Sequence, residues 1–219
     1  MGNHIQNLTD EEIAKLKEPT DERGSMVAHA MAQNGHIFSV NDLNAIGHWM
    51  NCNGHPVSHI MARKGYQFSV YDLLELGNPY DAYGFSLAHK MARDGHVFTV
   101  DELIMLGNRT DKSGNSMAEY MTMHKNYKFS LDELARLGVE DGHLLFYLRI
   151  YGLHLDKAEM KNLRAKIKRE KYTEAERGDM VLRFYQDEEC RQAVAAGQQP
   201  PVEILMERPD LLMEYGGVV

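Results

Sequence analysis

The stretch GFSLAHKMARDGHVFTVDELIMLG, residues 84–107, decides the fold of this chain. Its glycines, histidine, methionine and phenylalanine return with a spacing of 30 residues in the stretches on either side. Four sets of residues share this spacing: Gly24, Gly54, Gly84 and Gly114; His29, His59, His89 and Glu119; Met31, Met61, Met91 and Met121; Phe38, Phe68 and Phe98. Such a period indicates a stack of similar units, because one unit is too small to bury its own apolar face.

Each unit reads as two short helices. The run at 25–33 predicts a first helix, and Gly35 suits the left-handed position that follows a helix end. Ser39 and Asp42 approximate a capping box that predicts the start of a second helix, and the same device recurs at 69 and 72, 99 and 102, and 130 and 133. No stretch shows sustained strand-like alternation. The sequence therefore predicts an all-α protein built as a helix-turn-helix solenoid.

The unit at 84–107 resembles the ankyrin repeat. The spacings from Gly84 to His89, to the Gly95-His96 pair and to Gly107 follow the ankyrin pattern, and the resemblance covers about residues 8–156. The Thr-Pro pair of the family is replaced here by Ser86-Leu87, and each unit is about three residues shorter than the usual ankyrin unit. The resemblance implies an ankyrin-like solenoid with tight loops in place of long β-hairpin fingers.

Two regions follow from the extent of the repeat. We expect residues 1–156 to form the ankyrin-like repeat solenoid, with half a repeat, four clear repeats and a degenerate repeat that starts at Asp141-Gly142. We expect residues 157–219 to form a C-terminal helical capping region. Thr173 and Glu176 make a further capping box and predict a helix that runs to about Ala196. The candidates for its core are Met180, Val181, Phe184 and Tyr185.

Composition limits the classes of function. The 219 residues include 32 Asp and Glu against 24 Lys and Arg, and the net charge of −8 argues against a surface built throughout for nucleic acid. No apolar run is long enough for a membrane helix, and no secretory signal is visible. With only two cysteines, Cys52 and Cys190, we expect reduced thiols in the cytoplasm of its own cell or of a host cell, and no membrane partner.

The histidines invite a metal or acid–base hypothesis. His29, His59 and His89 hold one equivalent place in neighbouring units, which lie about 10 Å apart in a helix stack, too far to share one zinc ion. The ankyrin resemblance implies instead that this histidine bonds to main chain between units. No zinc, phosphate-loop or nucleophile-elbow motif occurs. We therefore expect no enzymatic activity, no catalytic residues, no cofactor and no metal.

The loops and first helices are the expected binding surface. Trp49, Tyr80 and Tyr83 stand in short loops, where aromatic side chains are natural interface anchors, although packing on the adjacent loop explains them equally well. The resemblance implies that the loops and the outer positions of the first helices line a concave face. The predicted contact residues for a partner protein are Trp49, Ile60, Arg63, Lys64, Tyr80, Tyr83, Lys90, Arg93, Asp94, Tyr120 and His124.

The expected function is a non-enzymatic scaffold that binds another protein and inhibits, recruits or tethers it. Compact ankyrin-like proteins of this kind are common among phage and pathogen proteins that act on a host factor. The alternative is the basic amphipathic helix predicted at 157–171, with contact to nucleic acid or an acidic partner through Lys161, Arg164, Lys166, Lys168 and Arg169. No aromatic pattern for base stacking accompanies these charges, so a solvated helix face is the simpler explanation.

Overall fold

The computed structural model describes residues 9–22, 24–125, 127–138, 155–170, 173–208, 210, 211 and 214. The chain divides into two compact units, Met1–Lys171 and Tyr172–Val219. The described residues contain 12 helices and no β-strand, so the all-α prediction is confirmed for this part of the chain. The degenerate repeat predicted from Asp141 falls almost entirely on residues 139–154, outside the described residues.

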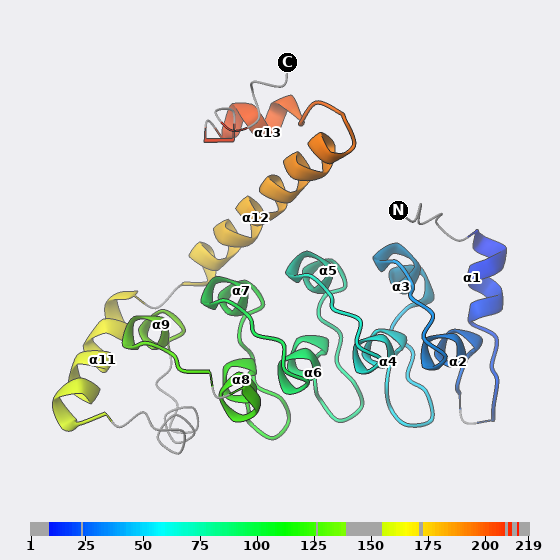
Figure 1. Cartoon of the computed structure of the whole chain (residues 1–219), viewed down its shortest axis with the longest axis horizontal. Helices are drawn as coiled ribbons and strands as arrows, with labels where there is room; N and C mark the ends of the chain where they lie inside the picture. The colour runs from blue at the N-terminus through cyan, green and yellow to red at the C-terminus, as the bar shows by residue number, and fades with distance from the viewer. Residues whose placement is uncertain are drawn as a thin grey trace. The chain divides into compact units, whose positions relative to one another are not determined.

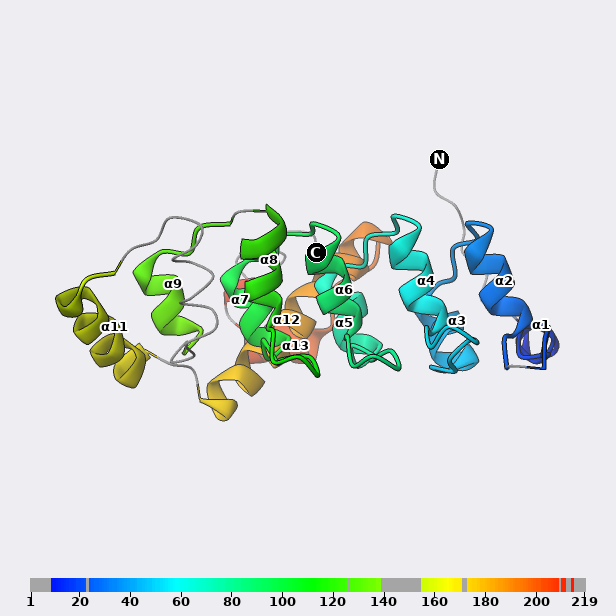
Figure 2. The ribbon, with the colours of Figure 1, turned by 90° about the horizontal axis from the view of Figure 1, so that it is seen from below.

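The short helices of the first unit form two layers, and consecutive helices along the chain alternate between them (Figure 1). The first layer holds α2 (Val27–Gln33), α4 (Val57–Arg63), α6 (Leu87–Arg93) and α8 (Met117–Lys125), and each of these helices contacts the next. The second layer holds α3 (Val40–Ile46), α5 (Val70–Glu75), α7 (Val100–Met105) and α9 (Leu131–Arg136). Figure 2 shows the first layer as a row of helices lying side by side.

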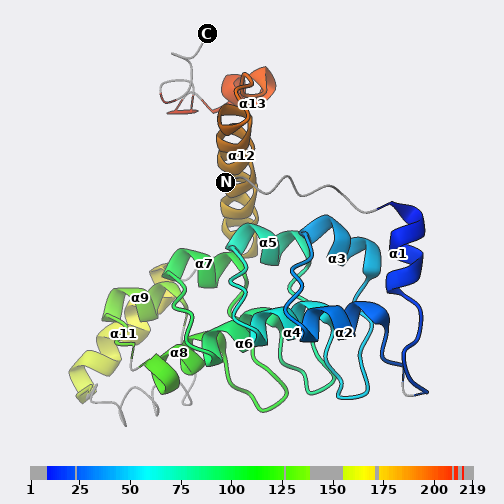
Figure 3. The same cartoon turned by 45° about the vertical axis from the view of Figure 1, so that its right-hand side comes forward.

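A further helix closes each end of these layers. Helix α1 (Asp10–Leu16) contacts α2 and α3, and α11 (Lys157–Glu170) packs against α9 (Figure 3). Leu163 and Ile167 of α11 are buried, as the predicted amphipathic pattern requires. The C-terminal region predicted from residue 157 includes this helix, whereas its contacts place it in the first unit.

Three of the first-layer helices, α2, α4 and α6, end at a glycine, as predicted. After α2, Gly35 has a φ of +89°, and its N–H donates to the Ala32 carbonyl at 3.0 Å. The N–H of His36 donates to the Met31 carbonyl at 3.0 Å, which completes a Schellman motif. The turns after α4 and α6 repeat both bonds. The chain therefore reverses between the two helices of a unit at the same place in the first three repeats.

The second-layer helices begin at capping boxes, also as predicted. The Ser39 hydroxyl accepts the N–H of Asp42 at 3.1 Å, and the Asp42 carboxylate accepts the N–H of Ser39 at 3.0 Å. The same reciprocal pair opens α5, α7 and α9. Each pair satisfies two main-chain donors that lack a partner inside the helix, and a capping side chain of this kind is worth about 1 kcal/mol.

The core lies between the layers and repeats with the units. Its phenylalanines and leucines are buried throughout: Phe38, Phe68, Phe98 and Phe129, and Leu43, Leu73, Leu103 and Leu134. Met61, Met91 and Met121 are buried as well, which confirms the core role expected for this column, while Met31 in the first repeat is only half-buried. Neighbouring units thus supply the cover that a single helix pair lacks.

The loops between units are tight. In the loop from α5 to α6, one oxygen of the Asp81 carboxylate accepts the N–H groups of Tyr83 and Phe85, both at 2.9 Å. An isolated bridge joins Tyr80 and Ser86, and the loop from α7 to α8 repeats this design around Asp111. Side-chain carboxylates therefore accept loop N–H groups that strand pairing would satisfy in a β-hairpin.

The second unit is a small helical assembly. It contains α12 (Glu174–Ala195), which starts at the predicted capping box of Thr173 and Glu176, and α13 (Val202–Glu207). Its buried core consists of Cys190, Leu205 and Leu211, with Ile204 packed against it. The predicted core residues Met180, Val181, Phe184 and Tyr185 are only half-buried. The core of this unit therefore lies at the C-terminal end of α12.

Two Gly→Ala substitutions test the effect of backbone conformation on stability without any effect of side-chain packing. Gly65 has a φ of +95° and Gly178 lies within α12, and at both sites an added methyl group meets nothing within 4 Å. We expect Gly65→Ala to destabilise the first unit by about 1–2 kcal/mol, because an L-residue is strained at this φ. We expect Gly178→Ala to stabilise α12 by about 0.5–1 kcal/mol.

The measurement is urea unfolding, followed by the fluorescence of Trp49 for the first unit and by helical circular dichroism for the whole chain. A neutral result for Gly65→Ala would contradict the turn geometry described above.

Candidate protein-binding surface

A buried histidine joins each of the helices α2, α4 and α6 to the next loop. The Nε2 atom of His29 donates to the Trp49 carbonyl at 2.9 Å, that of His59 to the Phe85 carbonyl at 3.0 Å, and that of His89 to the Arg109 carbonyl at 2.8 Å. These bonds confirm the expected hydrogen bond to main chain between units. They fix the loop main chain from which the candidate contact residues project.

The second ring nitrogen of each histidine has a different environment. In the first repeat, Nδ1 of His29 accepts the N–H of Met26 at 3.0 Å, and in the third, Nδ1 of His89 accepts the Ser86 hydroxyl at 2.7 Å. In the second repeat the equivalent residue is Pro56, which has no N–H to give. Nδ1 of His59 is buried and has no hydrogen-bond partner within the described residues.

Burial keeps these imidazoles neutral. It lowers the pKa of His59 to about 4, against the raising influence of the Phe85 carbonyl and of Asp81, while His55 and Lys90 lower it further. Burial also lowers the pKa values of His29 and His89. At neutral pH each ring therefore carries one N–H, which is the donor to the loop carbonyl. Among the described residues no group of His, Cys, Asp and Glu is arranged to hold a metal ion.

The loops also contact one another. The N–H of Ala82 donates to the Gly54 carbonyl at 2.9 Å, and Nζ of Lys112 donates to the Ala82 carbonyl at 2.9 Å. The Tyr83 ring lies 5.7 Å from the ring of His55 in the preceding loop. Three consecutive loops are therefore joined into one row along the first layer (Figure 3).

Aromatic side chains project from this row. Trp49 is 65% exposed, Tyr83 58% and Tyr80 39%, and Met50 beside Trp49 is also exposed. Contact with His55 accounts for one side of the Tyr83 ring, in line with the alternative that these rings pack on the adjacent loop, but most of the ring still faces solvent. Rigid exposed aromatics are typical anchors of protein interfaces.

A second group of predicted residues meets on α6 and α8. The Arg93 guanidinium lies 5.0 Å from the centre of the Phe85 ring, and the Tyr120 ring lies 5.9 Å from Phe85 and stacks on His124 at 6.0 Å. The Tyr120 hydroxyl donates to Asp111 at 2.7 Å. Sequence reasoning missed Phe85, although an aromatic residue where the other units have Ser25, His55 and Asn115 is a visible signal.

Three predicted contact residues belong to the interior instead. Ile60, Lys90 and Tyr120 occupy equivalent places on α4, α6 and α8, and all three are buried. Neighbouring helices cover this column, and the Lys90 amino group forms an ion pair with Asp94. A partner therefore cannot reach these side chains directly. Arg63, Lys64 and Asp94 are exposed and Arg93 is half-buried, so they remain on the surface.

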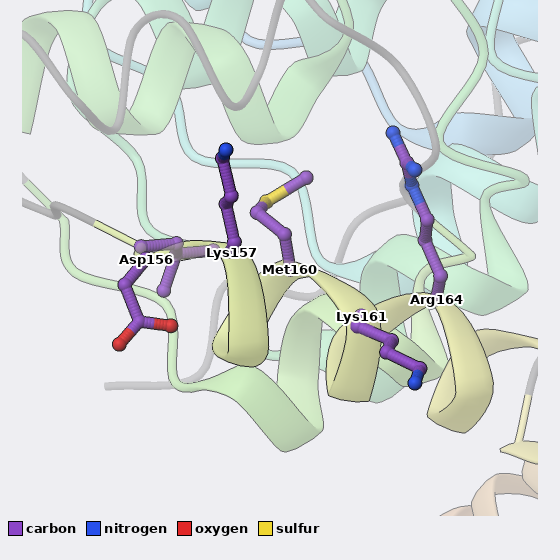
Figure 4. A pocket seen from close by; sticks show the side chains of 6 residues that line it. Asp156, Lys157, Met160, Lys161 and Arg164 are labelled. Atoms are coloured by element: carbon purple, nitrogen blue, oxygen red, sulfur yellow. The ribbon is translucent and has the colours of Figure 1, made fainter.

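The basic residues of α11 form a separate surface. Lys161, Arg164, Lys168 and Arg169 are exposed, whereas Lys166 forms an ion pair with Asp132 of α9. Lys157, Met160 and Arg164 project to one side, and Lys161 projects away from them (Figure 4). These residues, with Leu155 and Asp156, line an open pocket of about 360 Å³.

No protein-family model, curated protein or solved structure matches this chain. None of the helices in the described part of the chain is long and apolar enough to cross a membrane.

The buried histidines predict a loss of stability in mild acid. The unfolded chain binds a proton at each histidine below about pH 6.5, while folded His59 stays neutral down to about pH 4. Stability is therefore complete above pH 6.5 and falls as the pH drops towards 4, by up to about 3 kcal/mol from His59 alone.

The measurement is urea unfolding between pH 7 and pH 5, a range in which ordinary carboxylates change little. We expect His59→Gln to flatten the pH dependence, because the amide can still donate to the Phe85 carbonyl but does not titrate. His124→Gln, at an exposed histidine, is the matched control for the substitution itself. Equal slopes for the two variants would contradict the burial argument.

Proposed function

We propose that the first unit is an ankyrin-like solenoid. Three observations support this architecture: the 30-residue repeat, the two layers with helix-to-helix contact along the first layer, and the histidine bond from each unit to the next loop. In such a stack every unit contacts only its neighbours, which leaves one continuous face of loops and first-layer helices open to solvent.

We propose further that the protein is a non-enzymatic scaffold that binds another protein on this face. The observation that carries the proposal is the exposure of Trp49, Tyr80 and Tyr83 on loops whose main chain is fixed by hydrogen bonds. Rigid anchors lose little entropy on binding, so exposed aromatics on a fixed backbone favour tight association. A stoichiometric inhibitor or adaptor in the cytoplasm, including one from a phage or pathogen that acts on a host factor, fits this form.

The test begins with the partner. The full chain captures it from the native host or from infected cells, and cross-linking locates the contact on the chain. The dissociation constant of the purified pair is then measured by calorimetry for the wild type and its variants. We expect Trp49→Ala to raise the dissociation constant about 30-fold or more, because buried aromatic anchors contribute about 2 kcal/mol or more.

Leu182→Ala is the matched control, since Leu182 is 58% exposed but lies on α12 in the second unit, outside the proposed contact surface. Both variants should keep the melting temperature of the wild type. Equal effects of the two substitutions on binding, or no effect of either Trp49→Ala or Tyr83→Ala, would refute the loop assignment.

Nucleic-acid binding through α11 is the second candidate, favoured by the exposed cations of that helix. The variant Lys161→Glu, Arg164→Glu, Lys168→Glu tests it and spares Lys166, whose ion pair with Asp132 belongs to the packing of α11. If α11 binds phosphates, the affinity for duplex DNA or RNA falls steeply with salt and is lost in this variant. Absence of binding at low salt, in electrophoretic shift or anisotropy measurements, would exclude this function.

A further inference from the structure

Charge is segregated between the two helix layers of the first unit. The second-layer helices carry six exposed or half-buried acidic residues: Asp72, Glu75, Asp101, Glu102, Asp132 and Glu133. Their one basic residue, Arg136, forms an ion pair with Asp101. The first layer has the opposite character, with cations at the last turns of α4, α6 and α8.

We define the cation row as Arg63, Lys64, Arg93 and Lys125. These residues stand at the C-terminal ends of α4, α6 and α8, which lie side by side. The row continues from α6 to α8, because the Lys125 side chain of α8 lies directly against Gly95 in the turn that follows α6. A side chain on Gly95 would collide with it. Arg63, Lys64 and Lys125 are exposed, and Arg93 is held over the Phe85 ring.

Acidic residues near the first layer are engaged within the protein. Asp81 and Asp111 accept loop N–H groups, Glu119 is buried and accepts the N–H of Ser116, and Asp94 pairs with Lys90. The positive charge of the cation row is therefore not cancelled by its own layer.

The fold itself does not require these cations. Basic residues near a helix C-terminus do interact favourably with the helix dipole, but this energy is at most about that of one hydrogen bond. Helix α2, however, ends in the same Schellman motif with Gln33 and Asn34 at the equivalent places and no basic residue in its last turn. The same turn therefore forms after α2 without any cation, so the turn does not need the cation row.

A small pocket adjoins the row. It has a volume of about 260 Å³ and lies between the turns that follow α2 and α4. Ile37, Met61 and Tyr66 give it apolar walls, and Lys64 stands at its edge. Ile37 is largely exposed, so a partner side chain can bury apolar surface here beside a cation.

We propose that the cation row binds an acidic segment of the partner protein, and that an apolar side chain of the same segment occupies the pocket of Ile37, Met61 and Tyr66. This inference rests on the protein-binding function proposed above and adds the chemistry of the partner. Charge complementarity supports it, because the row is the positive part of a unit whose other layer is acidic.

The same segregation argues against nucleic acid as the occupant of this surface. The acidic second layer lies about one helix diameter, roughly 10 Å, behind the cations, which is slightly more than the screening length of about 8 Å at physiological salt and well within it at low salt. A continuous phosphate chain is repelled by that layer along its whole length, whereas a short acidic segment places a few carboxylates directly on the row.

Peptide titration on the full-length, isotope-labelled protein tests the surface by itself. The probe is a short peptide that alternates Glu and Leu. The controls are a peptide with Lys in place of each Glu and a single-stranded oligonucleotide. We expect the acidic peptide alone to shift the amide signals of residues 63–66, 93–95 and 124–125 at low ionic strength, and the shifts to fade at high ionic strength. No binding of this peptide, or stronger binding of the oligonucleotide at the same residues, overturns the proposal.

Charge reversal tests the same surface against the captured partner. We expect a quadruple charge reversal of the row to raise the dissociation constant tenfold or more, because the interaction energies of several surface ion pairs are lost together. The substitutions are Arg63→Glu, Lys64→Glu, Arg93→Glu and Lys125→Glu. The matched control reverses four cations elsewhere, at Lys15, Lys17, Lys161 and Lys168, and should change the constant less than about threefold. Melting temperatures identify any variant that fails to fold, and Lys64→Gln with Lys125→Gln then replaces the reversals.

The two proposals fail in different ways. If a partner binds and its affinity depends on Trp49 but neither on salt nor on the cation row, the protein-binding function stands and the acidic-segment inference is wrong. If the row binds the acidic peptide but no partner is captured, the chemistry of the surface stands and the proposed function fails.

Discussion

The buried hydrogen bond from an imidazole to a loop carbonyl is the interaction on which the first unit depends. It occurs three times, from His29, His59 and His89, and each time it joins a first-layer helix to the main chain of the following loop. The loops contain no strand pairing beyond isolated bridges, so their main-chain groups need partners from side chains. Burial removes competing water and lowers the pKa of the ring, so the imidazole remains a neutral donor at physiological pH.

In this bond a loop residue uses only its main-chain carbonyl, so its side chain takes no part in the attachment. The carbonyl of Trp49 binds His29 while its indole faces solvent, and the carbonyl of Phe85 binds His59 while its ring supports Arg93. Because only the main chain is used for attachment, the side chains at these places can differ from loop to loop without loss of the scaffold. The repeated positions therefore hold the units together, and the varied positions are available for recognition.

How much the sequence reveals depends on the distance between the groups that interact. The capping boxes and the glycine at the helix end were predictable, because Ser39 and Asp42, or Met31 and His36, lie within five residues of each other. The burial of Ile60 and Lys90 was not, since the covering atoms come from helices about one repeat away. The same holds for the contact of Phe85 with Tyr120, and for the packing of α11 against α9.

The acidic and basic residues of the first unit differ in how well folding accounts for them. Asp42, Asp72, Glu102 and Glu133 close the capping boxes of the second layer, so folding alone requires much of the negative charge there. The cation row closes no capping box, and unlike Lys112 it donates to no loop carbonyl in the described part of the chain. A positive surface that the fold does not require, together with exposed aromatic side chains that the fold does not bury, is the combination that supports the proposed protein-binding function.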